Sequence, residues 1–275
     1  MRKERSVIPL ILILASAAFI FLMLALPLLL ILVESFRAGL DFFAAAISDP
    51  YALKALQLTG IATVSSVGLN TLFGLAAAWA ITRFSFPGKG LLTTFIDIPF
   101  AVSPVIAGLI FILTFGRISW LHPFLSAYDL KVVFAVPGII IATVFVTFPF
   151  VAREIIPVLE ARGTEEEQAA SLMGAGFLTI FRRITFPHIK WALLYGVILC
   201  TARAMGEFGA VSVVSGRLRG KTNTLPLYIE NLYDEHQFTA AFAVSSILVA
   251  AAIIILIARN IVEYTAKKDE DTNVR

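Results

Sequence analysis

The sequence predicts an all-α integral membrane protein that crosses the bilayer six times, and three observations lead to this fold class. Its 275 residues are 59% hydrophobic and only 15% charged, with a mean hydropathy of +0.88, which is more apolar surface than a soluble domain of this size could bury. Six predominantly apolar runs are each long enough, as helices, to cross a hydrocarbon core about 30 Å thick. The runs lack the two-residue alternation of a transmembrane β-barrel, so helices are the structure expected to satisfy the backbone in lipid.

The six expected spans, taken from these apolar runs, are residues 7–33, 55–82, 91–115, 132–152, 191–214 and 238–258. The first run follows Arg2, Lys3 and Arg5 and therefore resembles a signal peptide. It is about twice as long as a secretory apolar region, however, and no small-residue cleavage site closes it. We therefore expect this run to be retained as a transmembrane helix.

The basic residues between the runs predict the orientation of the chain. With the N-terminus in the cytoplasm, 14 of the 22 Lys and Arg residues lie on the cytoplasmic side and seven lie outside, while Arg203 lies within a span. This bias predicts that both termini are cytoplasmic, because cytoplasmic loops of membrane proteins are enriched in Lys and Arg. The basic residues form no continuous stripe, so nucleic acid is not an expected partner.

The sequence holds no grouping of residues that predicts catalysis or a metal site. Cys200 is the single cysteine, and the three histidines lie in different segments without ligand-like spacing. Residues 216–222 are similar to a nucleotide-binding P-loop, but three residues separate the glycines where four are required, and no strand precedes them. We expect a chain that is not an enzyme, binds no cofactor and cannot hydrolyse ATP itself.

The segment between the fourth and fifth spans, residues 153–190, has the pattern of two short helices. Thr164 followed by three glutamates has the form of a capping box, with the hydroxyl accepting from first-turn amides. Gly174 can take the left-handed conformation that ends a helix, and a second helix is expected over residues 177–186, before Pro187. Such a segment could be a spacer, an interfacial anchor or a docking site, and its flanking charges and tight turn favour docking.

This segment resembles the EAA loop of ABC importer permeases, which in that family seats in a groove of the ATPase subunit. Gln168 stands where Glu is typical, although Glu167 adjoins it, and Phe186 stands where Leu is typical. The resemblance implies an ATPase-coupling role for a set of residues spread over the segment. These are Glu167, Gln168, Ala169, Ala170, Gly174, Ile184 and Pro187.

Four further stretches, residues 82–89, 97–104, 148–154 and 202–216, resemble the W-type permease subunits of sulfate/thiosulfate importers. Molybdate/tungstate permeases share the same plan and remain an alternative. The resemblance implies a single six-helix type I ABC importer transmembrane domain over residues 1–275, in a bacterial cell membrane. It further implies a second, T-type permease, an extracytoplasmic sulfate/thiosulfate-binding protein and two copies of an ATP-binding subunit, which would use the ATP and Mg²⁺.

Three charged residues lie within the expected spans. Arg203 and Glu207 are four residues apart on one helical face, and Arg203 is about 18 Å along the helix from Trp191. A charge near mid-membrane costs at least about 2.5 to 3.5 kcal/mol, so each must face the bundle interior or an aqueous path. The pair could be a structural ion pair that neutralises itself, or it could line the translocation path or its gate.

Asp97, with Pro99 and Pro104 after it, is the third charged position, near the cytoplasmic end of its span. Prolines remove backbone hydrogen bonds and bend helices, so a kink that lines the path is one interpretation and simple packing is the other. Arg153 and Glu154 close the fourth span and are expected to be interfacial anchors. A secondary anion transporter is the rival function, but it would need helices broken at the midplane, and no pair of interrupted spans is predicted.

Overall fold

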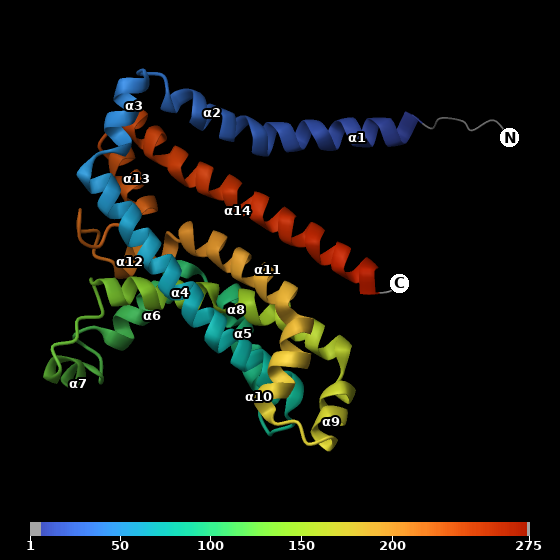
Figure 1. The fold of residues 1–275 in the computed structure, drawn as a ribbon. Coiled ribbons are helices and arrows are strands. Elements are labelled where there is room, and N and C mark those ends of the chain that lie inside the picture. The colour runs from blue at the N-terminus through green and yellow to red at the C-terminus, as the bar shows by residue number, and fades with distance from the viewer. Residues whose placement is uncertain (1–6, 274–275) are drawn as a thin grey trace.

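The structure is a computed structural model, and it describes residues 7–273; Arg2, Lys3 and Arg5 lie outside the described residues. Every regular element within this range is helical, and Figure 1 shows their arrangement. In chain order the elements are α1 (Val7–Ile20), the π-helical turn η1 (Phe21–Ala25), α2 (Leu26–Ser35), α3 (Leu40–Ile47), α4 (Pro50–Arg83), α5 (Lys89–Ala101), α6 (Pro104–Phe115), α7 (His122–Ala127), α8 (Val136–Arg162), α9 (Glu165–Leu172), α10 (Phe177–Ile180), the π-helical turn η2 (Phe181–Thr185), α11 (Phe186–Met205), α12 (Gly209–Val214), α13 (Leu225–Asp234) and α14 (Phe238–Asn273).

The helices support the predicted membrane fold. Five continuous helical stretches are long and apolar enough to cross a bilayer, and the bent pair α5 and α6 makes a sixth if it is counted as one span. Several of these helices extend beyond the apolar runs, since α4 begins at Pro50 and α8 continues to Arg162. An apolar run marks the part of a helix that lies in lipid, and the helix itself can continue into the polar layers.

The centre of the bundle is formed by α4, α8 and α11, which pack closely through small residues. A side chain on Gly74 would lie 3.1 Å from the Val151 side chain, and one on Gly196 would meet the backbone of the same residue at 3.1 Å. Across the same interface the buried Asn70 amide donates hydrogen bonds to Thr147 Oγ1 at 2.7 Å and to a carbonyl of α8. Small residues and interhelical hydrogen bonds are the usual means of joining helices in lipid.

The expected span at 91–115 is not one helix. The chain ends α5 at Ala101 and begins α6 at Pro104, and the two helices meet at an angle of 113°. Val102 and Ser103 both have ψ near 130°. At Ser103 this is expected, because the residue before a proline is kept out of the α-helical conformation. Pro99, in contrast, is accommodated within α5.

The expected span at 191–214 is also interrupted. Helix α11 ends at Met205, three residues are non-helical, and the short helix α12 follows. The two interruptions lie against each other, because a side chain on Gly209 would approach Pro104 to 2.9 Å. The sequence-based expectation that no pair of spans is interrupted was therefore wrong. The absence of interrupted spans can no longer be used as an argument against a secondary transporter.

The long helices place the remaining elements at two ends of the molecule (Figure 1). Helices α9 and α10 lie toward one end, as do the first described residues of α1 and the last of α14. Helices α3, α7, α12 and α13 lie toward the opposite end. The segment between α8 and α11 and the two ends of the described chain are thus on the same side of the bundle.

Candidate functional site

The helix pair α9 and α10, with the turn between them, projects from the end of the bundle; we call residues 164–187 the α9–α10 hairpin. Gly174 has a φ of +86°, the left-handed conformation expected for it. The amide of Ala175 donates to the Ala170 carbonyl at 3.0 Å, and the amide of Gly174 donates to the Ser171 carbonyl at 2.9 Å. This is a Schellman motif, which ends α9 and fixes the tight turn.

The start of α9 differs from the expected capping box. Thr164 is the N-cap residue, but its hydroxyl accepts no hydrogen bond from the first-turn amides. It accepts instead from the Gln168 side-chain amide at 2.9 Å. Its ψ is 4°, whereas N-cap residues that direct their oxygen at the amides are usually extended. The three glutamates still occupy the first turn, where they meet the positive end of the helix dipole.

The second helix of the hairpin does not stop at Phe186. Helix α10 passes through the π-helical turn η2 directly into α11, so one helical rod runs from Phe177 to Met205. Pro187 lies in the first turn of α11, immediately after η2. A π-helical turn accommodates a proline that lacks an amide and crowds the preceding turn. The hairpin and α11 are therefore directly joined by continuous helix.

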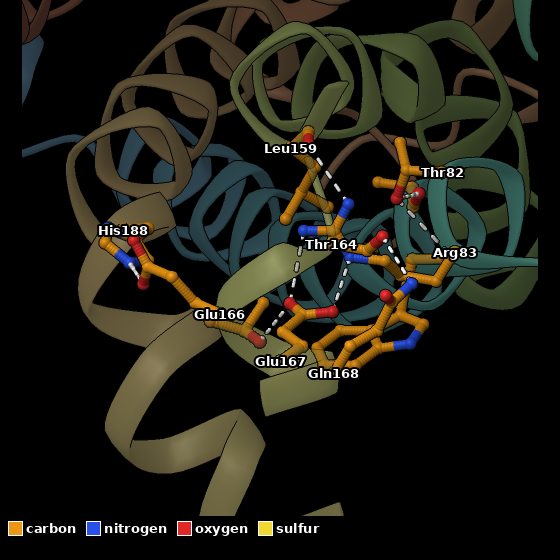
Figure 2. Close-up of polar contacts among 11 residues, drawn as sticks. Thr82, Arg83, Leu159, Thr164, Glu166, Glu167, Gln168 and His188 are labelled. Carbon is orange, nitrogen blue, oxygen red and sulfur yellow. Dashed lines mark hydrogen bonds and ion pairs between the residues drawn. The ribbon is translucent and has the colours of Figure 1, made fainter. Parts of the chain in front are cut away.

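Glu167 anchors the hairpin to the bundle, as Figure 2 shows. Its carboxylate binds the Arg83 guanidinium through two contacts, at 2.8 and 3.1 Å, and accepts from the Thr185 hydroxyl at 2.6 Å. Arg83 also donates to the Leu159 carbonyl at 3.0 Å. The side chains of Arg83 and Glu167 are only 8% and 15% exposed. This contact set joins α9 to the ends of α4 and α8 and to η2.

The tip of the hairpin is exposed and apolar. Leu172, Met173, Phe177 and Leu178 are between 68% and 90% exposed, although all four are large hydrophobic residues. These four residues end α9 and begin α10, so the apolar surface lies at the turn of the hairpin. Contiguous exposed apolar surface of this kind is typical of a protein–protein contact.

The predicted coupling residues fall into two groups in the structure. Gln168, Ala169, Gly174 and Pro187 are exposed on the hairpin. In contrast, Ala170 is buried, Ile184 is half-buried and Glu167 is engaged with Arg83. Sequence reasoning did not find Arg83 and Thr185 as partners of Glu167 or the apolar tip. The sequence pattern that could have indicated the apolar tip is four large apolar residues on either side of the turn, between the three glutamates of α9 and the two arginines of η2.

The predicted charge pair forms at the interruption after α11. Arg203 and Glu207 are joined at 2.6 Å, and the Glu207 side chain is buried while that of Arg203 is about one third exposed. Glu207 lies beyond the end of α11, so the two residues do not share one continuous helix as expected. The other oxygen of Glu207 accepts from the Ala210 amide, in the first turn of α12, at 2.9 Å.

Asp97 pairs with Arg153, which sequence reasoning assigned to the membrane interface. Arg153 Nε donates to Asp97 Oδ1 at 2.7 Å, and a second guanidinium nitrogen lies 2.5 Å from Oδ2. This two-point contact joins α5 to α8 on a partly exposed face. Within residues 7–273 no hydrogen bond or ion pair connects Asp97 with Arg203 or Glu207. The structure therefore brings the three predicted path residues into two separate pairs.

Residues 70–268 match the family described as binding-protein-dependent transport system inner membrane components. The match covers most of the sequence, and the chain belongs to this family. The chain is therefore a membrane component of a binding-protein-dependent transport system.

Sequence relatives give a finer comparison. The chain is 48% identical over 263 residues to the sulfate transport system permease protein CysW of Synechococcus elongatus, covering 96% of this chain and 92% of the relative. It is 45% identical over 240 residues to CysW of Escherichia coli K12, covering 87% and 82%. It is 37% identical over 214 residues to the sulfate transport system permease protein CysT of Salmonella typhimurium, covering 78% and 77%.

Solved structures support the fold. A bacterial ABC transporter involved in the import of the acidic polysaccharide alginate superimposes with a TM-score of 0.78, covering 96% of both chains at 14% identity. At this identity the likeness concerns the fold alone, which is that of an ABC importer permease.

Proposed function

We propose that this chain is the W-type permease subunit of an ATP-driven sulfate/thiosulfate importer and forms part of its translocation pathway. The observation that carries the proposal is the 48% identity, over nearly the whole length of both chains, to a sulfate permease of the CysW type. Identity to relatives of the CysT type is lower, at 30% to 37%, which favours the W-type over the T-type subunit. An ATP-driven molybdate or tungstate importer is the alternative that shares the fold.

The proposed complex contains a T-type permease beside this chain, two copies of an ATP-binding subunit and an extracytoplasmic sulfate/thiosulfate-binding protein. The complex lies in a bacterial cell membrane, with the α9–α10 hairpin and both termini in the cytoplasm. The two-to-one excess of basic residues on that side supports this orientation. ATP and Mg²⁺ are used by the ATP-binding subunits, and this chain is a non-catalytic subunit.

The α9–α10 hairpin is the proposed contact with the ATP-binding subunit. Its exposed tip, Leu172, Met173, Phe177 and Leu178, would enter a groove of that subunit. The Glu167–Arg83 pair would hold the hairpin rigidly against α4 and α8, and η2 would connect it to α11. Closure of the ATP-binding subunits would then move these helices together and open the path outward, as alternating access requires.

The charge pairs are the proposed elements of the path or its gate. Arg203 is the more exposed member of its pair, so its positive charge is available to lower the electrostatic barrier to a divalent anion. Glu207 neutralises part of this charge and would prevent the anion from being trapped. Asp97, held by Arg153, occupies a second charged position on the partly exposed face of α5 and α8.

Uptake of labelled anions tests the proposal. Cells lacking this subunit should lose sulfate uptake and regain it when the chain is supplied, with thiosulfate competing and molybdate not competing. Copurification of an ATP-binding subunit with the chain would support the coupling assignment. Restoration of molybdate uptake without sulfate uptake would replace sulfate by the alternative substrate.

A further inference from the structure

A cavity of about 520 Å³ lies between the end of α6, helix α7 and the segment that leads into α8. Its walls are mostly apolar and include Ile112, Leu125 and Val133. Two basic residues, Arg117 and Lys131, and the acidic Asp129 also line the cavity. This volume is within the roughly 300–1,000 Å³ typical of small-molecule sites. It belongs to the end of the molecule opposite the α9–α10 hairpin (Figure 1), so it is separate from the coupling site.

The cavity is built by the fold. Its wall at residues 125–134 contains two residues with positive φ, Asp129 and Phe134. This wall is held by the Leu130 amide donating to the Leu125 carbonyl at 2.9 Å and by the Phe134 amide donating to the Val214 carbonyl at 2.9 Å. The second bond fixes the wall to α12. A site with walls fixed in this way is formed before a ligand arrives.

The residues around the cavity are typical of a membrane–water boundary. Trp120 is 84% exposed and Tyr128 is 66% exposed, and Ile118 and Phe124 beside them are also exposed. They follow the outer end of α6 and precede α8, two elements of the expected membrane-spanning part. Trp and Tyr concentrate at the level of lipid headgroups. The cavity therefore faces the lipid boundary.

The basic groups of the cavity form no ion pair within the part of the chain that the structure describes. Among residues 7–273 no ion pair involves Arg117, His122 or Lys131, and none involves Asp129. At the same end of the molecule Arg219 is paired with a glutamate at 2.6 Å, so acidic partners are available elsewhere. Two basic side chains, Arg117 and Lys131, against the single acidic Asp129 give the cavity an excess of basic groups.

We propose that this cavity binds an anionic phospholipid, with its phosphate at Arg117 and Lys131 and an acyl chain against the apolar wall. The combination of unpaired cations with a long apolar surface favours a lipid over a small oxyanion. An oxyanion would fill little of a cavity that is much larger than the roughly 30 Å³ occupied by one water molecule. The proposal depends on membrane insertion and not on which anion the complex transports.

Photo-cross-linking in the assembled complex tests the site. The complex is placed in nanodiscs with phosphatidylglycerol that carries a photoactivatable group near the end of one acyl chain, and the labelled peptides are identified by mass spectrometry. We expect labelling of residues 112–134. The double variant Arg117→Gln/Lys131→Gln should lower this labelling by at least about fivefold, since one basic residue near an anionic membrane is worth about that factor in affinity.

Lys54→Gln is the matched control, because Lys54 is exposed and belongs to α4 rather than to the cavity wall. This variant should label like the unmodified chain. A competition series on the unmodified complex needs no variant: unlabelled phosphatidylglycerol should displace the probe better than phosphatidylcholine or phosphatidylethanolamine. The proposal would be overturned if all three lipids displaced the probe equally well, or if inorganic phosphate alone displaced it. It would also be overturned if labelling were lost only when the binding protein was added.

Discussion

The Glu167–Arg83 pair gives the most quantitative prediction, through the variant Glu167→Ala. The substitution removes the two contacts with Arg83 and the bond from Thr185. It leaves a guanidinium that is only 8% exposed with the Leu159 carbonyl as its remaining acceptor among the described residues. Breaking one partner of a buried ion pair costs about 3–5 kcal/mol. We use the lower limit of about 3 kcal/mol, because neither side chain is fully buried.

Because this contact set joins α9 to the bundle, its loss should favour detachment of α9 by the same free energy. A loss of about 3 kcal/mol raises the population of the detached hairpin by on the order of 100-fold. Hydrogen–deuterium exchange of the purified complex measures that population, and amides of residues 165–172 should exchange correspondingly faster while those of α4 and α8 do not change. ATP hydrolysis should persist in the same complex, with less sulfate transported per ATP.

Glu166→Gln is the matched control for this experiment. Glu166 is the neighbouring residue, and its contact with His188 Nε2 is 2.8 Å long but largely solvent-exposed on the glutamate side. Such pairs contribute about 0–1 kcal/mol, so exchange in α9 should change by less than about fivefold. If Glu167→Ala exchanges no faster than this control, the anchoring role assigned to Glu167 is wrong.

Three further variants test other parts of the account. Arg203→Ala should abolish uptake while the complex still assembles. Adding Glu207→Gln removes the buried charge left behind and should restore stability but not uptake. Normal uptake by the Arg203→Ala variant would exclude a role for Arg203 in the path. Gly174→Arg should uncouple ATP hydrolysis from uptake far more than Gly174→Ala, which shares the unfavourable positive φ; retained coupling in vesicles would count against docking of the hairpin. Gly108→Ala places a methyl group 2.7 Å from a carbonyl oxygen of α12 and should destabilise the purified protein by about 1–3 kcal/mol; a thermal midpoint equal to that of Gly68→Ala, where no atom lies within 4 Å, would contradict the tight packing of α6 on α12.

The sequence predicted the fold class well because hydropathy over about 20 residues records which segments lie in lipid. The same measure cannot detect a bend within an apolar run. The chain turns by 113° before Pro104, and α11 ends at Met205, yet apolar residues continue on both sides of each interruption. Proline and glycine signalled the positions, but whether a proline is accommodated, as Pro99 is, or ends a helix depends on the neighbouring helices.

The candidate site was predicted where local sequence determines structure. Gly174 ends α9 as its lack of a side chain suggested. The capping box at Thr164 failed because its backbone takes another conformation, which the pattern of residue types does not encode. Arg83 was not connected with Glu167 because the two are 84 residues apart and meet only through tertiary packing. The pairing of Asp97 with Arg153 was missed for the same reason.

Transport by the purified complex in vesicles examines the proposed function most directly. The complex containing this chain is reconstituted with its ATP-binding subunit, T-type permease and binding protein, and labelled sulfate is followed with ATP supplied on the side of the α9–α10 hairpin. We predict accumulation that requires ATP and is lost when the apolar tip is made polar by Leu172→Ser and Phe177→Ser. Accumulation that continues without ATP, or that is unaffected by these substitutions, would contradict the account.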